Sequence, residues 1–229
     1  MEIDLELFRR EVKVSSRPPV RLSVIDISPD HPQRTMVYIH GFGGWATQWK
    51  YQLQKFSTAN RVIGIDLRGH GLSDKPRGSY SMPEIQSDLQ STLDALGVSE
   101  PFALAGHSFG GALAAEFAAA HPQRVSHLIL IACAGEFRLN PLYRLALRLP
   151  VSYLQMLSPF TRRWLGAPPH VLKAWYENNL SQWNGWNLLR RLAVPTLVIR
   201  GHLDVVFERP AFEEVTRAIP GAEEADVGA

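Results

Sequence analysis

A serine flanked by glycines is the part of the sequence best suited to chemistry. Residues 106–111 read Gly-His-Ser-Phe-Gly-Gly, so that Gly106 precedes Ser108 by two positions and Gly110 follows it by two. A serine at a sharp strand-to-helix turn adopts a strained backbone with φ above zero, and small residues at these spacings let the strand and the helix approach each other. This arrangement predicts an exposed hydroxyl that acts as a nucleophile.

The segments on either side of Ser108 fit this geometry. The apolar run 102–105 predicts a buried strand before the turn, and the small residues of 111–115 predict a closely packed helix after it. The spacing of Gly106, Ser108 and Gly110 alone arises by chance in roughly one chain in ten of this length. The prediction of a nucleophile elbow therefore depends on this context.

Continuous apolar runs predict the strands of a mostly parallel sheet. They lack the polar–apolar alternation of half-exposed strands, which indicates burial on both faces. The runs are 35–40, 61–66, 102–105, 128–132 and 196–199. Before them, residues 11–27 alternate around Arg17-Pro18-Pro19, which predicts a hairpin with a proline turn.

Helical patterns separate these runs. Residues 45–56 and 83–96 carry apolar side chains at helical spacing, and Gly97 is the expected stop of the second helix. Residues 109–120 predict an alanine-rich helix, and 210–219 predict a last one. Alternating strands and helices predict an α/β fold with a doubly wound sheet.

Residues 136–186 break this alternation. The stretch is too long for an ordinary loop and mixes tryptophans and tyrosines with arginines. We predict a small helical cap over one end of the sheet, with an apolar substrate beneath it. The chain would then divide into a core of 1–135 and 187–229 and an insertion of 136–186. Helices packed at the side of the sheet are the alternative.

The composition is that of a globular protein with ordinary charge. Of 229 residues, 45% are hydrophobic and the net charge is +2, so neither nucleic acid nor an anionic membrane is an expected partner. No apolar run approaches the ~18 residues of a membrane span, and the acidic start lacks the order of a signal peptide. We expect a cytoplasmic protein with a small-molecule substrate and an inert, buried Cys133. The oligomeric state stays open.

Several motifs together resemble the α/β-hydrolase fold family. Besides the segment around Ser108, they are HGFGG at 40–44 and DLRGHGLSD at 66–74, each of which follows a predicted strand. The resemblance implies an esterase- or lipase-like hydrolase in which Ser108 attacks a carbonyl, an acyl-enzyme forms and water releases it. Epoxide and haloalkane chemistry is disfavoured, because this family uses a carboxylate nucleophile for it. Asp66 and Arg68 would brace loops beneath the site.

The resemblance also implies the other members of the site. The backbone N–H groups of Phe42 and Phe109 would form the oxyanion hole. Asp204, which follows the apolar run 196–199, matches the acid that orients a catalytic histidine, and Glu136 is a weaker rival. No metal or other cofactor is implied. Whether the substrate is an ester, a thioester, a lactone or a carbon–carbon diketone stays open.

The catalytic histidine of the family has no match in this sequence. In the family it follows the last strand, and here residues 223–227 give only the start of such a strand. We therefore expect the last strand and the closing helix to be missing and activity to be weak or absent, since losing a triad base typically costs about 10⁶ in turnover. His202 is the best substitute. A non-catalytic ligand-binding protein of the same fold is the alternative function.

Overall fold

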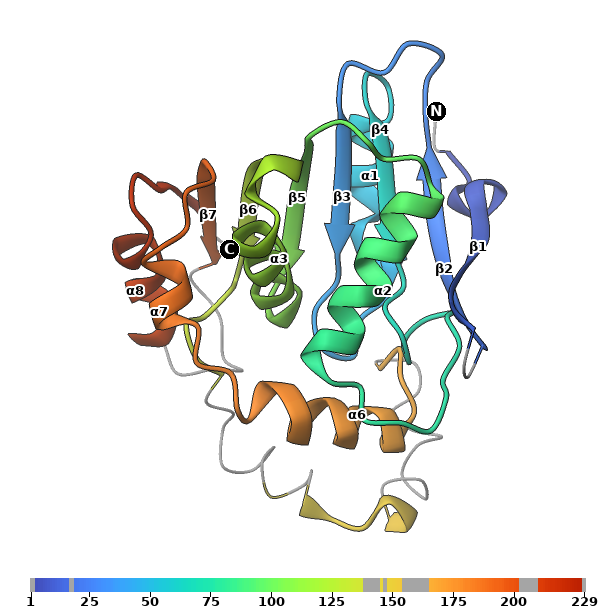
Figure 1. Ribbon diagram of the computed structural model, residues 1–229, viewed down its shortest axis with the longest axis vertical. Helices are drawn as coiled ribbons and strands as arrows, with labels where there is room; N and C mark the ends of the chain where they lie inside the picture. The colour runs from blue at the N-terminus through green and yellow to red at the C-terminus, as the bar shows by residue number, and fades with distance from the viewer. Residues whose placement is uncertain are drawn as a thin grey trace.

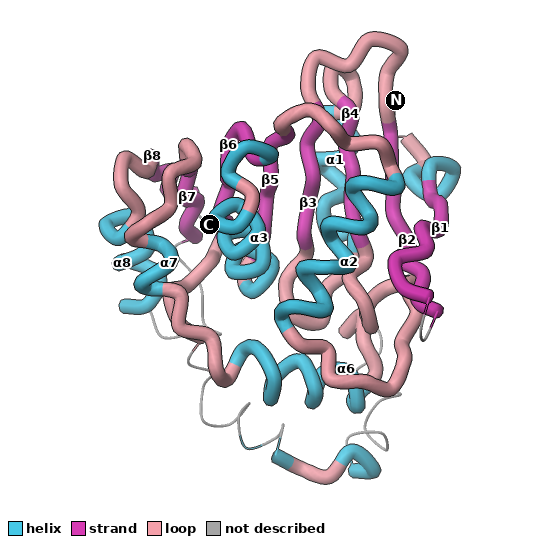
Figure 2. Tube along the Cα trace, viewed as in Figure 1, coloured by secondary structure: helices cyan, strands magenta, loops and turns pink. Residues whose placement is uncertain are grey.

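An eight-stranded sheet forms the middle of the molecule (Figure 1, Figure 2). The computed structural model of the chain describes residues 3–16, 19–137, 145, 148–153, 165–201 and 210–227. The strands are β1 (Arg9–Ser16), β2 (Pro19–Ile27), β3 (Thr35–Ile39), β4 (Arg61–Ile65), β5 (Phe102–His107), β6 (Val125–Ile131), β7 (Thr196–Gly201) and β8 (Glu223–Val227). Their order across the sheet is β1-β2-β4-β3-β5-β6-β7-β8.

The strand pairing confirms the predicted sheet and corrects its last member. β1 pairs with β2 and β2 with β4 in antiparallel fashion, whereas the pairs from β4 to β8 are parallel. The expectation that the last strand is missing is wrong, because β8 pairs with β7 from Glu223 to Val227. β5 extends beyond the predicted run as far as His107, so the strand leads directly into Ser108.

Helices cover both faces of the sheet, as a doubly wound fold requires. On one face, α2 (Met82–Ala95) and α3 (Phe109–Ala120) pack over inward-pointing residues such as Val37 and Leu104. On the other face, α1 (Lys50–Phe56) packs over residues such as Tyr38. Further helices of the described residues are η1 (Leu5–Phe8), η2 (Ala46–Trp49), η3 (Pro122–Arg124), α6 (Pro169–Trp175), η4 (Tyr176–Leu180), α7 (Trp186–Leu189) and α8 (Pro210–Ala218).

The helix α6 lies across the end of the sheet at which the parallel strands finish (Figure 1). It belongs to the stretch predicted to be an insertion, and its Val171 and Trp175 are buried against the rest of the molecule. The exact division into a core and a cap at 136–186 stays a prediction. Across the described helices, none combines the length and the apolar character needed to span a bilayer.

Cys133 lies where α3 packs on the sheet. The thiol is buried, and a Cβ added to Gly111 of α3 would come within 2.9 Å of its sulfur. Burial raises the pKa of the thiol to about 12, so the reactive thiolate is scarce at neutral pH. This environment confirms the prediction of a buried, inert cysteine.

Candidate active site

Ser108 lies at the turn between β5 and α3 with the predicted strained backbone. Its φ is 53° and its ψ is −123°. The Ser108 N–H donates to the Ile131 carbonyl at 2.8 Å, and the Ser108 carbonyl accepts from the Gly111 N–H at 2.9 Å. Strain of this kind typically costs about 1–3 kcal/mol and persists only where the surroundings enforce it. The side chain is half-buried, and its hydroxyl makes no hydrogen bond to another described residue.

The neighbouring glycines are required by close backbone contacts. A Cβ on Gly106 would lie 2.3 Å from the Gly110 carbonyl oxygen and 2.6 Å from Gly111 Cα. A Cβ on Gly110 would lie 2.3 Å from the His40 carbonyl oxygen. Because these contacts are with backbone atoms, a side chain at either position would push α3 away from the strands.

The loop after β3 lies directly beside Ser108. A Cβ on Gly41 would be only 3.1 Å from Ser108 Cβ. The Gly44 N–H donates to the Gly41 carbonyl at 3.0 Å, and the Gly43 N–H donates to His70 Nε2 at 3.2 Å. Within the described residues the Phe42 N–H has no such acceptor, which leaves it available to a ligand.

A cavity of about 410 Å³ brings part of the predicted site together. Ser108 and Phe42 both line it, and so do His107 and Gln48. Phe109 follows Ser108 as the first residue of α3, where an N–H has no acceptor within the helix. Its ring is fully buried, 5.7 Å from that of Trp175, and Phe109 is not among the described residues that line the cavity.

Two buried histidines hold the loops around the site. His40 Nδ1 donates to the Gly41 carbonyl at 2.7 Å, and His40 Nε2 accepts from the Leu67 N–H at 3.0 Å. His70 Nδ1 faces the Arg68 carbonyl at 3.2 Å while Nε2 receives the Gly43 N–H. Burial lowers the pKa of His40 and holds that of His70 well below 6.5, so both rings are neutral. Both rings tie the loop after β3 to the loop after β4, through Leu67 for His40 and through Gly43 for His70.

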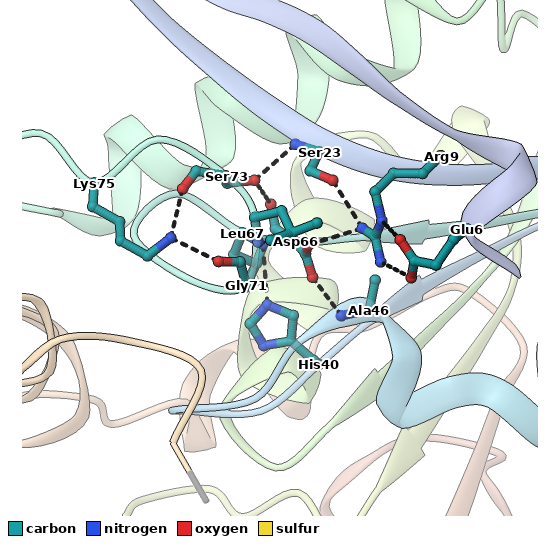
Figure 3. Close-up of polar contacts among 11 residues, drawn as sticks. Glu6, Arg9, Ser23, His40, Ala46, Asp66, Leu67, Gly71, Ser73 and Lys75 are labelled. Carbon is teal, nitrogen blue, oxygen red and sulfur yellow. Dashed lines mark hydrogen bonds and ion pairs between the residues drawn. The ribbon is translucent and has the colours of Figure 1, made fainter. Parts of the chain in front are cut away.

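Asp66 braces several loops at once, as predicted (Figure 3). Its buried carboxylate accepts hydrogen bonds from the Ala46 N–H at 2.6 Å, from the Leu72 N–H at 3.0 Å and from Arg9 Nη1 at 3.0 Å. These partners come from β1, from the segment that enters α1 and from the loop after β4. The carboxylate therefore fixes the position of the loop that begins at His40.

Arg68 makes a separate buried ion pair. Its Nε and Nη2 atoms each lie 2.6 Å from a carboxylate oxygen of Asp88 on α2. A two-point contact of this kind fixes orientation as well as distance. It anchors the loop after β4 to α2, which confirms the bracing role predicted for Arg68.

The segment before α6 is tied to both of these loops. The Gly166 N–H donates to the Gly43 carbonyl at 2.7 Å, and the Gly166 carbonyl accepts from the Gly71 N–H at 2.7 Å. The ring of Trp175 lies 4.8 Å from that of His70. Part of the predicted insertion thus covers the loops that surround Ser108.

A polar pair on the cavity wall was not foreseen from the sequence. Gln48 Nε2 and His107 Nδ1 are 3.0 Å apart, and both residues line the cavity beside Ser108. An exposed glutamine in a helical segment carries no signal of such a role. The pair places an amide and an imidazole close to the expected reacting atoms.

The acid of the site is predicted from the sequence. Asp204 and His202 lie outside the described residues. The rival Glu136 follows β6 and forms an isolated backbone bridge with Asn184, and it is not among the described residues that line the Ser108 cavity. Asp204 therefore stays the predicted acid.

Comparisons with known proteins agree with this architecture. A model of the "alpha/beta hydrolase fold" family matches residues 34–181, more than half of the chain. Epoxide hydrolase 1 of Caenorhabditis elegans is 35% identical over 123 residues, which cover 52% of this chain and 30% of that protein. The chain thus spans about a third of the length of this curated relative.

Solved structures extend the likeness over nearly the whole chain. A thermophilic esterase from Thermogutta terrifontis superimposes with a TM-score of 0.79 and 24% identity, covering 96% of this chain and 89% of that one. An enol-lactonase from Burkholderia xenovorans LB400 superimposes with a TM-score of 0.77 and 20% identity, covering 95% and 91%. At these identities the superpositions show the fold alone. The family match and the arrangement around Ser108 agree, and the chain belongs to the alpha/beta hydrolase fold family.

Proposed function

We propose that this chain carries the nucleophile of a serine hydrolase that acts on an ester-like carbonyl bond. One observation supports this most directly: the strained turn presents the Ser108 hydroxyl to a cavity that Phe42 also lines. A hydroxyl without a hydrogen-bond partner in the described residues is free to meet a substrate carbonyl. The similar solved structures named an esterase and an enol-lactonase support ester-like chemistry. The family resemblance implies a carboxylate nucleophile for epoxide opening, and the proposed nucleophile of this chain is Ser108.

The proposed reaction has two stages. Ser108 Oγ attacks the carbonyl carbon, and the negative charge that develops on the oxygen is held by the N–H groups of Phe42 and Phe109. Removing one such donor typically costs about 3–4 kcal/mol of transition-state stabilisation. The alcohol leaves, and water then releases the acyl group from Ser108.

A histidine is needed to accept the Ser108 proton, and Asp204 would orient it. His40 and His70 are excluded by their buried, fully engaged rings. No described histidine makes a hydrogen bond to the Ser108 hydroxyl. Free imidazole in solution can also take this proton, and we expect it to accelerate the reaction of Ser108.

The insertion would complete the site as a cap. The contacts of Gly166 and Trp175 with the loops around Ser108 support a boundary near 136–186, with the remaining residues forming the core. In this arrangement the cap excludes water from the carbonyl during acylation. We expect the substrate to be a small neutral molecule and the chemistry to need no cofactor.

The decisive experiment compares the chain with its Ser108→Ala variant on p-nitrophenyl acetate, with and without imidazole. We expect an initial release of p-nitrophenol that depends on Ser108 and grows with imidazole. Ser99→Ala, at an exposed loop position, is the matched control and should behave like the unaltered chain. Equal rates for the chain and Ser108→Ala under all conditions would contradict the proposal and favour a non-catalytic ligand-binding protein.

A further inference from the structure

A second cavity of about 690 Å³ adjoins the one that holds Ser108. The two cavities have Trp45, Thr47 and Leu165 in common, so they lie on opposite sides of a shared wall. The second cavity is larger than the first, which has about 410 Å³. No step of the proposed reaction uses it.

Backbone hydrogen bonds hold this wall in place, and the half-buried Leu165 side chain completes it. Gly166 is bonded on one side to Gly43 and on the other to Gly71, both at 2.7 Å. A Cβ on Gly166 would lie 2.7 Å from Trp45 Cε3, which shows how closely this segment crosses the indole. Leu165 Cδ2 lies 3.1 Å from the place a Cβ on Gly43 would take. The half-buried Leu165 side chain can rotate without breaking either backbone bond.

The lining of the second cavity favours an uncharged, apolar occupant. Leu72, Pro168, Pro169 and Leu172 contribute apolar surface beside Trp45. The lining also includes two acidic and two basic residues, whose formal charges cancel. They are Glu6, Asp66, Arg9 and Lys75.

These four charged side chains already have partners (Figure 3). Arg9 Nε lies 2.6 Å from Glu6 Oε2, and Arg9 Nη1 lies 3.0 Å from Asp66 Oδ2. Lys75 Nζ donates to the Gly71 carbonyl at 2.7 Å and to the Ser73 carbonyl at 2.9 Å. An ionic ligand would have to compete with these contacts, whereas an aliphatic chain can pack on the apolar side chains of the lining and leave these contacts in place.

We propose that the second cavity receives the unreactive aliphatic end of a neutral substrate whose carbonyl lies at Ser108, and that Leu165 limits entry to it. The identity of the reacting end rests on the proposed function. Short chains would be held in the first cavity alone. Longer chains would displace the Leu165 side chain and reach the surface formed by Leu72 and Leu172.

Binding to the Ser108→Ala chain tests this without any need for catalysis. The probes are methyl esters of straight-chain acids from butanoate to decanoate, and calorimetry measures their affinity. Each buried methylene should raise affinity roughly fourfold, so the ratio of decanoate to butanoate affinity reports entry into the second cavity. We expect Leu165→Ala to raise this ratio at least tenfold by removing most of the movable wall.

A second variant tests the part of the second cavity that only the longer esters would reach. Leu72 is 66% exposed, so Leu72→Asp should fold normally while placing a charge beside the aliphatic chain. We expect it to lower the decanoate-to-butanoate ratio and leave butanoate affinity unchanged. Leu7→Ala is the matched control, because Leu7 is 79% exposed and lines neither cavity.

The possible outcomes separate this inference from the proposed function. A ratio that Leu165→Ala and Leu72→Asp leave unchanged would overturn the second binding cavity, whatever the unaltered chain hydrolyses. If the ratio shifts as expected but the unaltered chain shows no hydrolysis that depends on Ser108, the cavity stands and the hydrolase proposal fails.

Discussion

Helix propensity and tertiary geometry make opposite predictions for Gly110→Ala. Gly110 is the second residue of α3, and alanine is favoured over glycine inside a helix by about 1 kcal/mol. The added Cβ, however, would lie 2.3 Å from the His40 carbonyl oxygen and 2.7 Å from that of Ile39. Both are backbone atoms at the end of β3, so the helix itself must move.

The geometric effect should dominate. Overpacking of a well-packed interior typically costs about 1–3 kcal/mol, and here no flexible side chain can yield. Because both contacts are with backbone atoms, the overpacking cost should lie in the upper part of that range, at about 2–3 kcal/mol. After subtraction of the propensity gain of about 1 kcal/mol, we expect the free energy of unfolding to fall by about 1–2 kcal/mol. Movement of the start of α3 also displaces Ser108 and the Phe109 N–H, and a 1 Å misplacement can cost about 10²-fold in rate.

Urea unfolding gives the stability change, and release of p-nitrophenol gives the change in Ser108-dependent rate. Gly78→Ala is the matched control, because Gly78 is exposed and a Cβ there meets no atom within 4 Å. It should leave both quantities nearly unchanged. If Gly110→Ala proved as stable as the unaltered chain, or more stable, the close approach of α3 to β3 would be refuted.

Two further perturbations concern the buried polar groups around the site. Asp66→Ala leaves the Ala46 N–H and Arg9 without their buried acceptor. We expect the free energy of unfolding in urea to fall by about 3–5 kcal/mol, and a loss below ~1 kcal/mol would contradict the bracing role of Asp66. Because burial lowers the pKa values of His40 and His70, the unfolded chain binds more protons below its ordinary histidine pKa of 6.5. The free energy of unfolding should therefore be full above pH ~6.5 and fall on acidification by up to about 1.4 kcal/mol per pH unit for each ring. We expect His70→Gln to reduce the slope of the free energy of unfolding against pH between pH 6.5 and 5. An unchanged slope would show that His70 is not held neutral.

Local sequence determined the strands, the principal helices and the backbone of the nucleophile turn. A run such as 102–105 must be buried on both faces wherever it lies, and a serine between Gly106 and Gly110 fits one kind of turn. These requirements are steric and act between neighbours in the chain, so a pattern of a few residues expresses them. The positive φ of Ser108 could therefore be predicted before any coordinates were known.

Tertiary structure alone decided which groups surround that turn. Arg9 reaches Asp66 across 57 positions of the chain, the His70 ring receives the Gly43 N–H, and Gln48 meets His107. Such contacts depend on how separate loops pack at the end of the sheet, and no single segment encodes that packing. The same holds for the wall between the two cavities, since hydrogen bonds from Gly166 to two separate loops and packing against the core place Leu165 there.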